Sequence, residues 1–139
     1  MTTSAHNLDW LLDDLVAHIP GVRHAVVLST DGLLLGRSSV MPVEDAEHFA
    51  AMAATLQGLA RSAGHRFAGG NVRQTVIELD HAVMFATSAG PNACLALLTD
   101  ETANMGMVAY EINQTVHRVG TYLSTAPRQG FGYFDNADS

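Results

Sequence analysis

The chain has 139 residues, of which 47% are apolar and 15% charged, so it can bury one hydrophobic core but not two. Its net charge is −7, and all seven of its basic residues are arginine. Without lysine the chain cannot form a Walker-type phosphate loop or a Schiff-base centre, and scattered arginines on an acidic chain argue against nucleic acid as a partner.

Nothing in the sequence predicts a membrane span or a secretory leader. The apolar run at residues 93–98 is far shorter than the roughly 18 residues that a span needs, and no other run exceeds it. Residues 1–7 have neither the basic start nor the apolar stretch of a signal peptide. The single cysteine, Cys94, excludes an internal disulfide and is typical of a reducing compartment. We therefore expect a cytoplasmic protein that does not insert into a membrane.

The first predicted element is an amphipathic helix over residues 8–19. Its leucines, valine and isoleucine recur at the three- and four-residue spacing of one helical face. Asn7 is placed to cap the N-terminus of this helix, and Pro20-Gly21 ends it. The acidic pair Asp13-Asp14 is expected on the solvent side, opposite the leucines.

A hairpin and a long helix follow. Residues 24–30 and 33–38 read as strands, and the Asp-Gly pair between them favours the tight turn of a hairpin. Residues 43–66 contain no proline and much alanine, which predicts a long helix. We expect this helix to turn a stripe of mostly larger residues toward the core, namely Phe49, Met52, Ala53, Leu56, Leu59, Ala60 and Ala63.

Three strands and a last helix complete the pattern. Short turns predict an antiparallel meander of strands over 72–79, 82–88 and 93–98. The last helix is expected to begin at Thr99-Asp100 and to end before Pro127. The order αββαβββα predicts an α+β fold, with helices on the faces of a five-stranded antiparallel sheet. We expect one domain over residues 1–125 and a polar tail over 126–139 that carries Phe131, Tyr133 and Phe134.

No arrangement of residues is typical of an enzyme or a metal site. Seven histidines occur, and none is paired with another at the spacing of metal ligands. Cys94 lies in the middle of a predicted strand, where we expect it to pack as a small apolar residue. The carboxylates of residues 44–47 fall in the first turn of a helix, where they offset the helix dipole. We therefore expect no catalytic residue, no cofactor and no metal ion.

The long helix carries a second, smoother face. Small residues recur along it at every fourth position, with the polar Gln57, Arg61 and His65 among them. Such a ridge allows another backbone to approach closely, which favours an interface. Alternatively, alanine simply fills an exposed helix with good helix formers. The ridge consists of Ala46, Ala50, Ala54, Gly58 and Ser62.

The strand over 72–79 has the character of a sheet edge. It carries the polar residues Arg73, Gln74 and Glu78 directly after a helix. Charged residues at an edge either block pairing with other chains or decorate an edge that pairs with a second copy across a two-fold axis. This strand and the ridge are therefore the two candidate contact surfaces.

Several segments resemble the Roadblock/LC7 family. They are the hairpin PGVRHAVVLSTDGLLL at 20–35, the strand residues 74–79, 82–85 and 94–98, and the helix start at Asn104-Met105-Gly106. The resemblance implies a profilin-like fold in which the long helix covers one sheet face and the terminal helices cover the other. It also implies a homodimer formed through the third strand and the second helix.

The same resemblance implies a non-catalytic regulator or scaffold of a small Ras-like GTPase. The expected partners are a second copy of the chain, that GTPase and a sensor-kinase-like protein. Two other functions stay open, an adaptor in a membrane-associated kinase complex and a small-ligand sensor. The candidate contact residues are Ala50, Ala54, Gly58, Arg61, Ser62, His65, Arg73, Thr75 and Ile77.

Overall fold

Across residues 2–125, which the computed structural model describes, eight elements follow one another in the predicted order αββαβββα. The helices span Thr2–His18 (α1), Val43–Arg66 (α2) and Met105–Thr125 (α3). The strands span Val22–Ser29 (β1), Leu34–Arg37 (β2), Gln74–Glu78 (β3), Ala82–Ser88 (β4) and Ala93–Asp100 (β5). The three aromatic residues of the tail lie outside the described residues.

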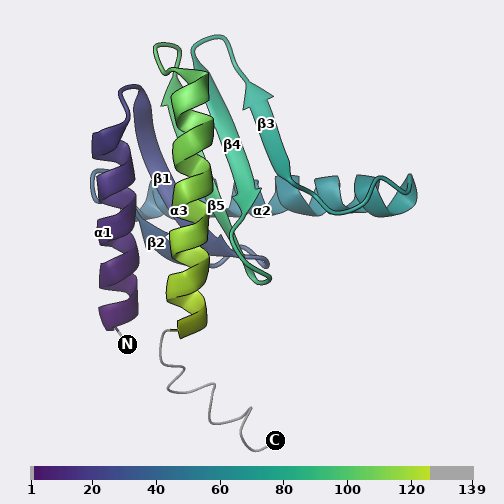
Figure 1. The fold of residues 1–139 in the computed structure, drawn as a ribbon, viewed down its shortest axis with the longest axis horizontal. Coiled ribbons are helices and arrows are strands. Elements are labelled where there is room, and N and C mark those ends of the chain that lie inside the picture. The colour runs from purple at the N-terminus through teal and green to yellow at the C-terminus, as the bar shows by residue number, and fades with distance from the viewer. Residues whose placement is uncertain (1, 126–139) are drawn as a thin grey trace, which may run out of the picture.

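The strands form one five-stranded sheet in the order β2-β1-β5-β4-β3 (Figure 1). Every neighbouring pair is antiparallel, as predicted. Gly32 has a φ of +94° in the turn between β1 and β2, which explains why glycine follows Asp31 there. The two edges of the sheet are β2 and β3, so the edge position expected for the strand of Arg73, Gln74 and Glu78 is confirmed for β3.

Helices cover both faces of the sheet. Helices α1 and α3 lie side by side on one face, and α2 crosses the other face (Figure 1). Successive residues of β1 serve opposite faces, because Val27 packs in the cluster under α1 and α3 while Val26 packs in the cluster under α2. Within the described residues, no helix combines the length and the apolar character that crossing a membrane requires.

Two expectations for α1 are wrong. The helix begins at Thr2, because no glycine or proline interrupts residues 2–18, and Asn7 therefore lies inside it and not at its cap. Asp13 is also not simply solvated. Its Oδ1 accepts hydrogen bonds from the backbone N–H of Ser39, at 2.7 Å, and from the Ser39 hydroxyl. One turn earlier, Asp9 Oδ1 accepts the backbone N–H of Arg37 at 2.8 Å, so carboxylates of α1 occupy backbone donors along the β2 edge.

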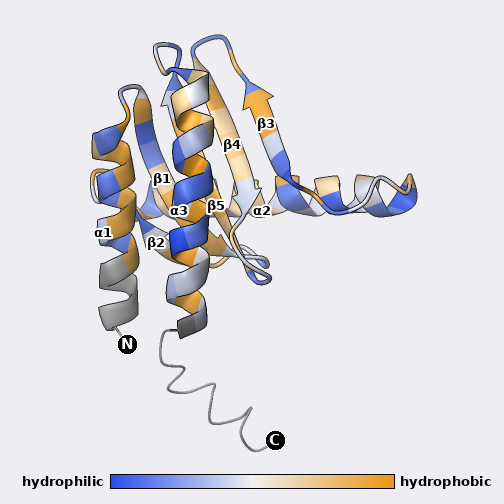
Figure 2. Ribbon diagram, in the orientation of Figure 1, coloured by the Kyte–Doolittle hydropathy of each residue, from blue (hydrophilic) through white to orange (hydrophobic). Residues whose placement is uncertain are grey.

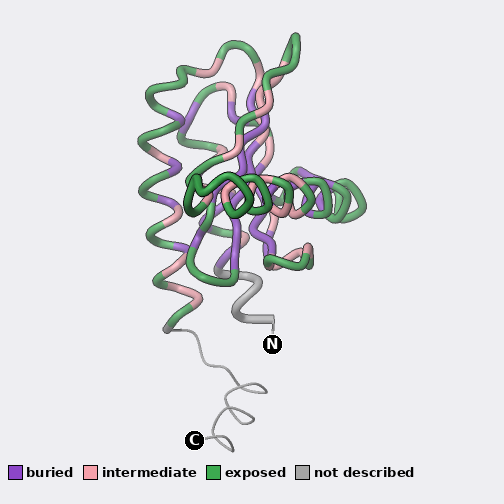
Figure 3. The backbone as a smooth tube through the Cα atoms, turned by 90° about the vertical axis from the view of Figure 1, so that its right-hand side faces the viewer, coloured by how far each residue is buried: buried purple, intermediate pink, exposed green. Residues whose placement is uncertain are grey.

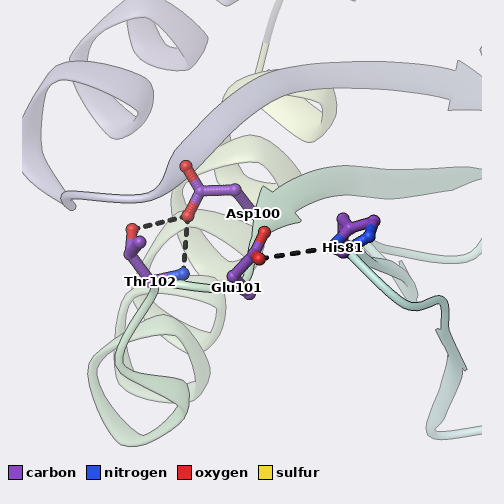
Figure 4. Close-up of polar contacts among 4 residues, drawn as sticks. All are labelled: His81, Asp100, Glu101 and Thr102. Atoms are coloured by element: carbon purple, nitrogen blue, oxygen red, sulfur yellow. Dashed lines mark hydrogen bonds and ion pairs between the residues drawn. The ribbon is translucent and has the colours of Figure 1, made fainter.

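The last helix begins later than Thr99-Asp100, because those residues complete β5. The Asp100 carboxylate stays in the turn after the strand, where it accepts the backbone N–H and the hydroxyl of Thr102 (Figure 4). Beside this turn, the exposed ring of His81 lies 3.3 Å from the Glu101 carboxylate (Figure 4). The cap of α3 is Asn104, whose Oδ1 accepts the N–H of Met107, as the Asn104-Met105-Gly106 segment implies.

Candidate functional site

Helix α2 extends past the edge strand β3 (Figure 1). Its buried residues end at Gln57, and residues 58–66 include none. We call residues 58–66 the projecting end of α2; at 1.5 Å per residue it is about 13 Å long. Figure 3 looks along α2 from this end and shows its turns exposed. This end of α2 therefore has no buried residue beneath which a core could lie within the described chain.

The orientation of α2 differs in part from the predicted one: Phe49 and Ala53 face the sheet as expected, but other residues of the predicted stripe do not. Met52 and Leu59, expected in the core, are 53% and 68% exposed, and Ala60 and Ala63 are not buried either. The reason is that the facing strands offer small residues, Ala86 and Ala96, so the small side of α2 fits closely against them. The residues of α2 that face the sheet are Ala46, Phe49, Ala50, Ala53 and Gln57.

This orientation determines which of the candidate residues on the helix are exposed. Ala50 is fully buried against the sheet, so it offers no surface to a partner and leaves the candidate site. Ala54 is half-buried and packs against the same cluster. The candidates that lie on the projecting end are Gly58, Arg61, Ser62 and His65, with Gly58 half-buried and the other three exposed.

Gln57 joins α2 to the edge strand, although we expected it on the outer face of the helix. Its side chain is only 4% exposed, and its Oε1 accepts the hydroxyl of Thr75 at 2.7 Å. Thr75 and Ile77 are half-buried on the α2 side of β3, whereas Arg73 is exposed just before the strand. The structure thus brings the strand candidates and the helix candidates to the same edge of the molecule.

Several of the exposed apolar side chains lie near this edge, and others are distributed over the rest of the described surface. Leu59 on the projecting end, Phe67 just after it, Val76 on β3 and Leu79 after β3 are all exposed, Phe67 at 76%. Figure 2 shows hydrophobic and hydrophilic residues mixed along the projecting end, with hydrophobic colour on β3. Val76 alternates with Thr75 and Ile77 and so lies on the face of β3 opposite α2, which means that these apolar groups border the edge from both faces.

Three glycines let the chain fold back from α2 to β3. Gly69 N–H donates to Gly64 O at 2.7 Å, and Gly70 continues the turn with a φ of +91°. A Cβ on Gly64 would lie 2.2 Å from Gly70 O, so only glycine permits this approach of the return segment to the helix. The return segment therefore runs directly against the last turn of α2.

A hollow of about 940 Å³ lies between the projecting end, the return segment and the turn from β4 to β5. A smaller hollow of about 300 Å³ adjoins it and reaches Cys94. Burial raises the pKa of the Cys94 thiol to about 11, against the weaker opposing effects of a backbone hydrogen bond at Thr87 and of the Arg61 charge. The thiol is therefore protonated at neutral pH, and it is no activated nucleophile. Residues that line both hollows are Gln57, Arg61, Ser88, Gly90 and Pro91.

Among the described residues, no group of three or more histidine, cysteine, aspartate or glutamate side chains is arranged to hold a metal ion. The His81–Glu101 pair in Figure 4 is exposed and has no third ligand-type neighbour within that part of the chain.

Comparison with known proteins identifies the family. The sequence profile of the Roadblock/LC7 domain matches residues 8–99. A Roadblock/LC7 domain from Streptomyces avermitilis is 42% identical, with a TM-score of 0.81 over 84% of this chain and 98% of that chain. At 17% identity, the gliding protein MglB of Thermus thermophilus shares the fold, with a TM-score of 0.78 over 88% of this chain and 93% of that one.

Profilin IA of Acanthamoeba castellanii also shares the fold, at 15% identity and a TM-score of 0.55 over 84% of this chain and 96% of profilin. The profilin-like architecture expected from the sequence is thereby confirmed. With the profile covering most of the chain and a close structural match of the same family, the chain belongs to the Roadblock/LC7 domain family.

Proposed function

We propose that this protein is a non-catalytic, cytoplasmic homodimer that regulates or scaffolds a small Ras-like GTPase. The observation that carries the proposal is the projecting end of α2 beside the open edge strand β3, in a chain of the Roadblock/LC7 family. Dimerisation would come before binding of the GTPase, because the arrangement expected for the family places the second helices of two copies side by side on one surface. The GTPase is the partner that the family resemblance implies.

The two sheet edges differ in a way that favours pairing at β3. At the β2 edge, Asp9 and Asp13 accept backbone N–H groups, and this shields the edge. Within the described residues, no side chain bonds to the backbone of β3. If β3 pairs with its copy, the sheet continues into the second chain, and the projecting end of each α2 lies over the sheet of the other. The exposed Leu59 and Val76 then have apolar surface to cover them.

Gly58 offers a direct test of this dimer. A Cβ at Gly58 meets only the end of the Arg61 side chain, 3.8 Å away, so substitution there leaves the monomer intact. We expect G58E to yield monomers, because the glutamate side chain fills the space into which a second backbone would pack, and its charge would have to leave water together with that of the neighbouring Arg61. The matched control is A17E on the exposed side of α1, which adds the same charge and leaves the dimer unchanged. Sedimentation velocity measures both, and a dimer that persists in G58E contradicts the contact.

A test of the regulatory role requires the GTPase itself. The protein is mixed with each small Ras-like GTPase of its organism, loaded with GDP or with a GTP analogue, and complex formation and hydrolysis rate are measured. We expect binding to one GTPase to depend on its nucleotide, and G58E to weaken it. Failure to bind any of them in either state contradicts the proposal. Binding to a sensor-kinase-like protein with an unchanged hydrolysis rate instead identifies an adaptor.

A further inference from the structure

We propose that His24 is a proton-sensitive latch, which holds the first turn of α2 against the sheet only while its ring is neutral. His24 lies near the start of β1, beside the first turn of α2 and therefore at the other end of that helix from the projecting end. The inference does not depend on the homodimer or on the GTPase. Three observations lead to it: the buried nitrogen of the His24 ring, the charges around the ring, and the weak anchoring of the first turn of α2.

The ring of His24 lies on the face of the sheet that α2 covers. His24 and Val26 are two residues apart on β1 and share this face, and Val26 packs in the cluster under α2. The ring is half-buried, but its Nδ1 is shielded from solvent and has no hydrogen-bond partner in the described part of the chain. In a neutral ring this nitrogen is an unpaired acceptor. In a protonated ring it carries an N–H, and a buried charged donor without an acceptor costs far more free energy.

Two charged side chains act on the ring, one from its own strand and one from α2. Burial lowers the pKa of His24 from its ordinary value of 6.5, and the positive charge of Arg23 lowers it further. The carboxylate of Asp45, in the first turn of α2, opposes both effects. The ring is therefore neutral at pH 7. When it takes up a proton, Asp45 is the carboxylate placed to attract it.

The other described elements around the ring add no such charge. Opposite His24, β5 offers the apolar Leu98, and Asp100 beyond it is held in the turn that follows β5. The segment 38–42, which leads from β2 to α2, has no titratable side chain, and the Arg37 guanidinium donates to two of its backbone carbonyls. The remaining titratable groups at the start of α2 are exposed, namely Glu44, Glu47 and His48.

The first turn of α2 is the part of the helix that a change at His24 can release. Its N-cap is Pro42, which supplies no side-chain acceptor for the free N–H groups of the helix. Val43 is exposed, and Ala46 is the first buried residue of the helix. A single backbone hydrogen bond, from Ala46 N–H to Pro42 O at 2.9 Å, closes this turn. Movement of a protonated ring toward Asp45 or toward solvent therefore loosens the turn.

The direction of the pH effect follows from the lowered pKa of His24. An unfolded or opened chain takes up this proton near pH 6.5, whereas the folded chain takes it up only at a lower pH. Between these two values the opened state binds more protons, so the latch weakens as the pH falls, by at most about tenfold in the opening equilibrium for each pH unit. Above pH 6.5 the latch is fully effective. Acidification thus acts on the helix that carries the candidate contact residues at its far end.

The first test is an NMR titration of the full-length protein between about pH 8 and pH 5, a range that spans the ordinary pKa of histidine. We expect the His24 ring to titrate below 6.5, R23Q to raise its pKa and D45N to lower it. These three side chains are exposed or half-exposed, so the variants keep the fold. E44Q is the matched control, because it removes an equal charge from the residue next to Asp45 and should move the pKa less. Titration of His24 at or above 6.5, or an effect of E44Q equal to that of D45N, overturns the proposal.

The second test measures the latch itself by amide hydrogen exchange. After correction for the intrinsic exchange rate, protection of the Ala46 amide should fall roughly tenfold from pH 7 to pH 5 in the native chain. It should stay constant in H24F, whose ring has no nitrogen to protonate, and in H24Q, a second neutral variant with a smaller side chain. H48Q, which removes an exposed histidine of the same helix, should behave like the native chain. The Val108 amide, which closes the first turn of α3 by donating to Asn104 O, should keep its protection throughout.

The latch is disproved if Ala46 loses protection equally in the native chain and in both His24 variants. It is also disproved if Val108 loses as much protection as Ala46, because the whole chain and not the first turn of α2 then responds to acid. The sedimentation test of G58E is independent of these measurements, since it is made at neutral pH, where the latch is closed. Loss of either proposal therefore leaves the other to be judged on its own data.

Discussion

Single glycines allow segments of this chain to approach one another closely. Gly21, at the start of β1, has a φ of +94°, and its carbonyl accepts the N–H of Asp100 at 2.8 Å. A Cβ on Gly21 would lie 2.6 Å from the Cα of Ala103. Gly70 has nearly the same φ, +91°, but nothing lies within 4 Å of its Cβ position. The two positions thus share a backbone conformation and differ in packing.

This pair gives a prediction at the residue scale. G70A should lower the free energy of unfolding by about 1–2 kcal/mol, because alanine disfavours the left-handed conformation. G21A should cost about 1–3 kcal/mol more, because its methyl group also collides with backbone of the β5–α3 turn. Denaturant unfolding of both variants measures the difference. Equal losses would mean that this turn moves away from Gly21 at little cost.

At the scale of elements, α1 does more than cover a sheet face. Through Asp9 and Asp13, one turn apart, it accepts two backbone donors along the β2 edge. Asp14, on the same helix, makes only distant ion pairs, 4.0 Å from His18 and 3.9 Å from Arg118. Neighbouring carboxylates of one helix therefore have different structural roles.

The corresponding prediction compares these carboxylates. D9A should lower the free energy of unfolding by about 1–2 kcal/mol, since it leaves the half-buried N–H of Arg37 without its charged acceptor. D14A should change it by less than about 0.5 kcal/mol, because exposed ion pairs contribute little. Urea unfolding under the same conditions measures both, and a loss in D14A as large as in D9A would contradict this difference.

The order and type of the elements follow from local sequence, because turn residues such as Asp31-Gly32 act where they stand. The orientation of α2 does not follow from local sequence. Its larger residues and its small ones each recur at helical spacing, and Met52 and Leu59 are the more hydrophobic choice for a core. Which set faces the sheet depends on Ala86 of β4 and Ala96 of β5, against which α2 packs. The sequence of the helix alone contains no information about these two residues.

Only part of the candidate site could be predicted from the sequence. The polar residues of β3 indicated its edge position correctly, whereas the assignment of Arg61 and His65 as contact residues stays a prediction. The hollow could not be predicted, because it requires Gln57 to meet Thr75 and the β4–β5 turn, which are far away in the chain. Contacts of this kind depend on how the sheet is assembled.

At the scale of the whole molecule, the proposed dimer makes stability depend on concentration. Association stabilises the folded state by mass action, so the melting temperature should rise by several degrees, on the order of 5 °C, when the protein concentration increases a hundredfold. G58E should show no such dependence, and A17E should behave like the native chain. Calorimetry over this range of concentrations measures the effect, and a native melting temperature that does not vary contradicts a reversible dimer.

The unequal edges of the sheet also limit how far assembly can proceed. A sheet with two open edges can pair with a further chain at each edge, and copies can then add indefinitely, as they do in fibrils. Here Asp9 of α1 accepts the N–H of Arg37 at the end of β2 and Asp13 accepts that of Ser39 just beyond it, whereas no side chain bonds to the backbone of β3 within residues 2–125. In the proposed dimer, pairing through β3 would therefore end at two copies, because the contacts of α1 oppose the addition of a further chain at β2.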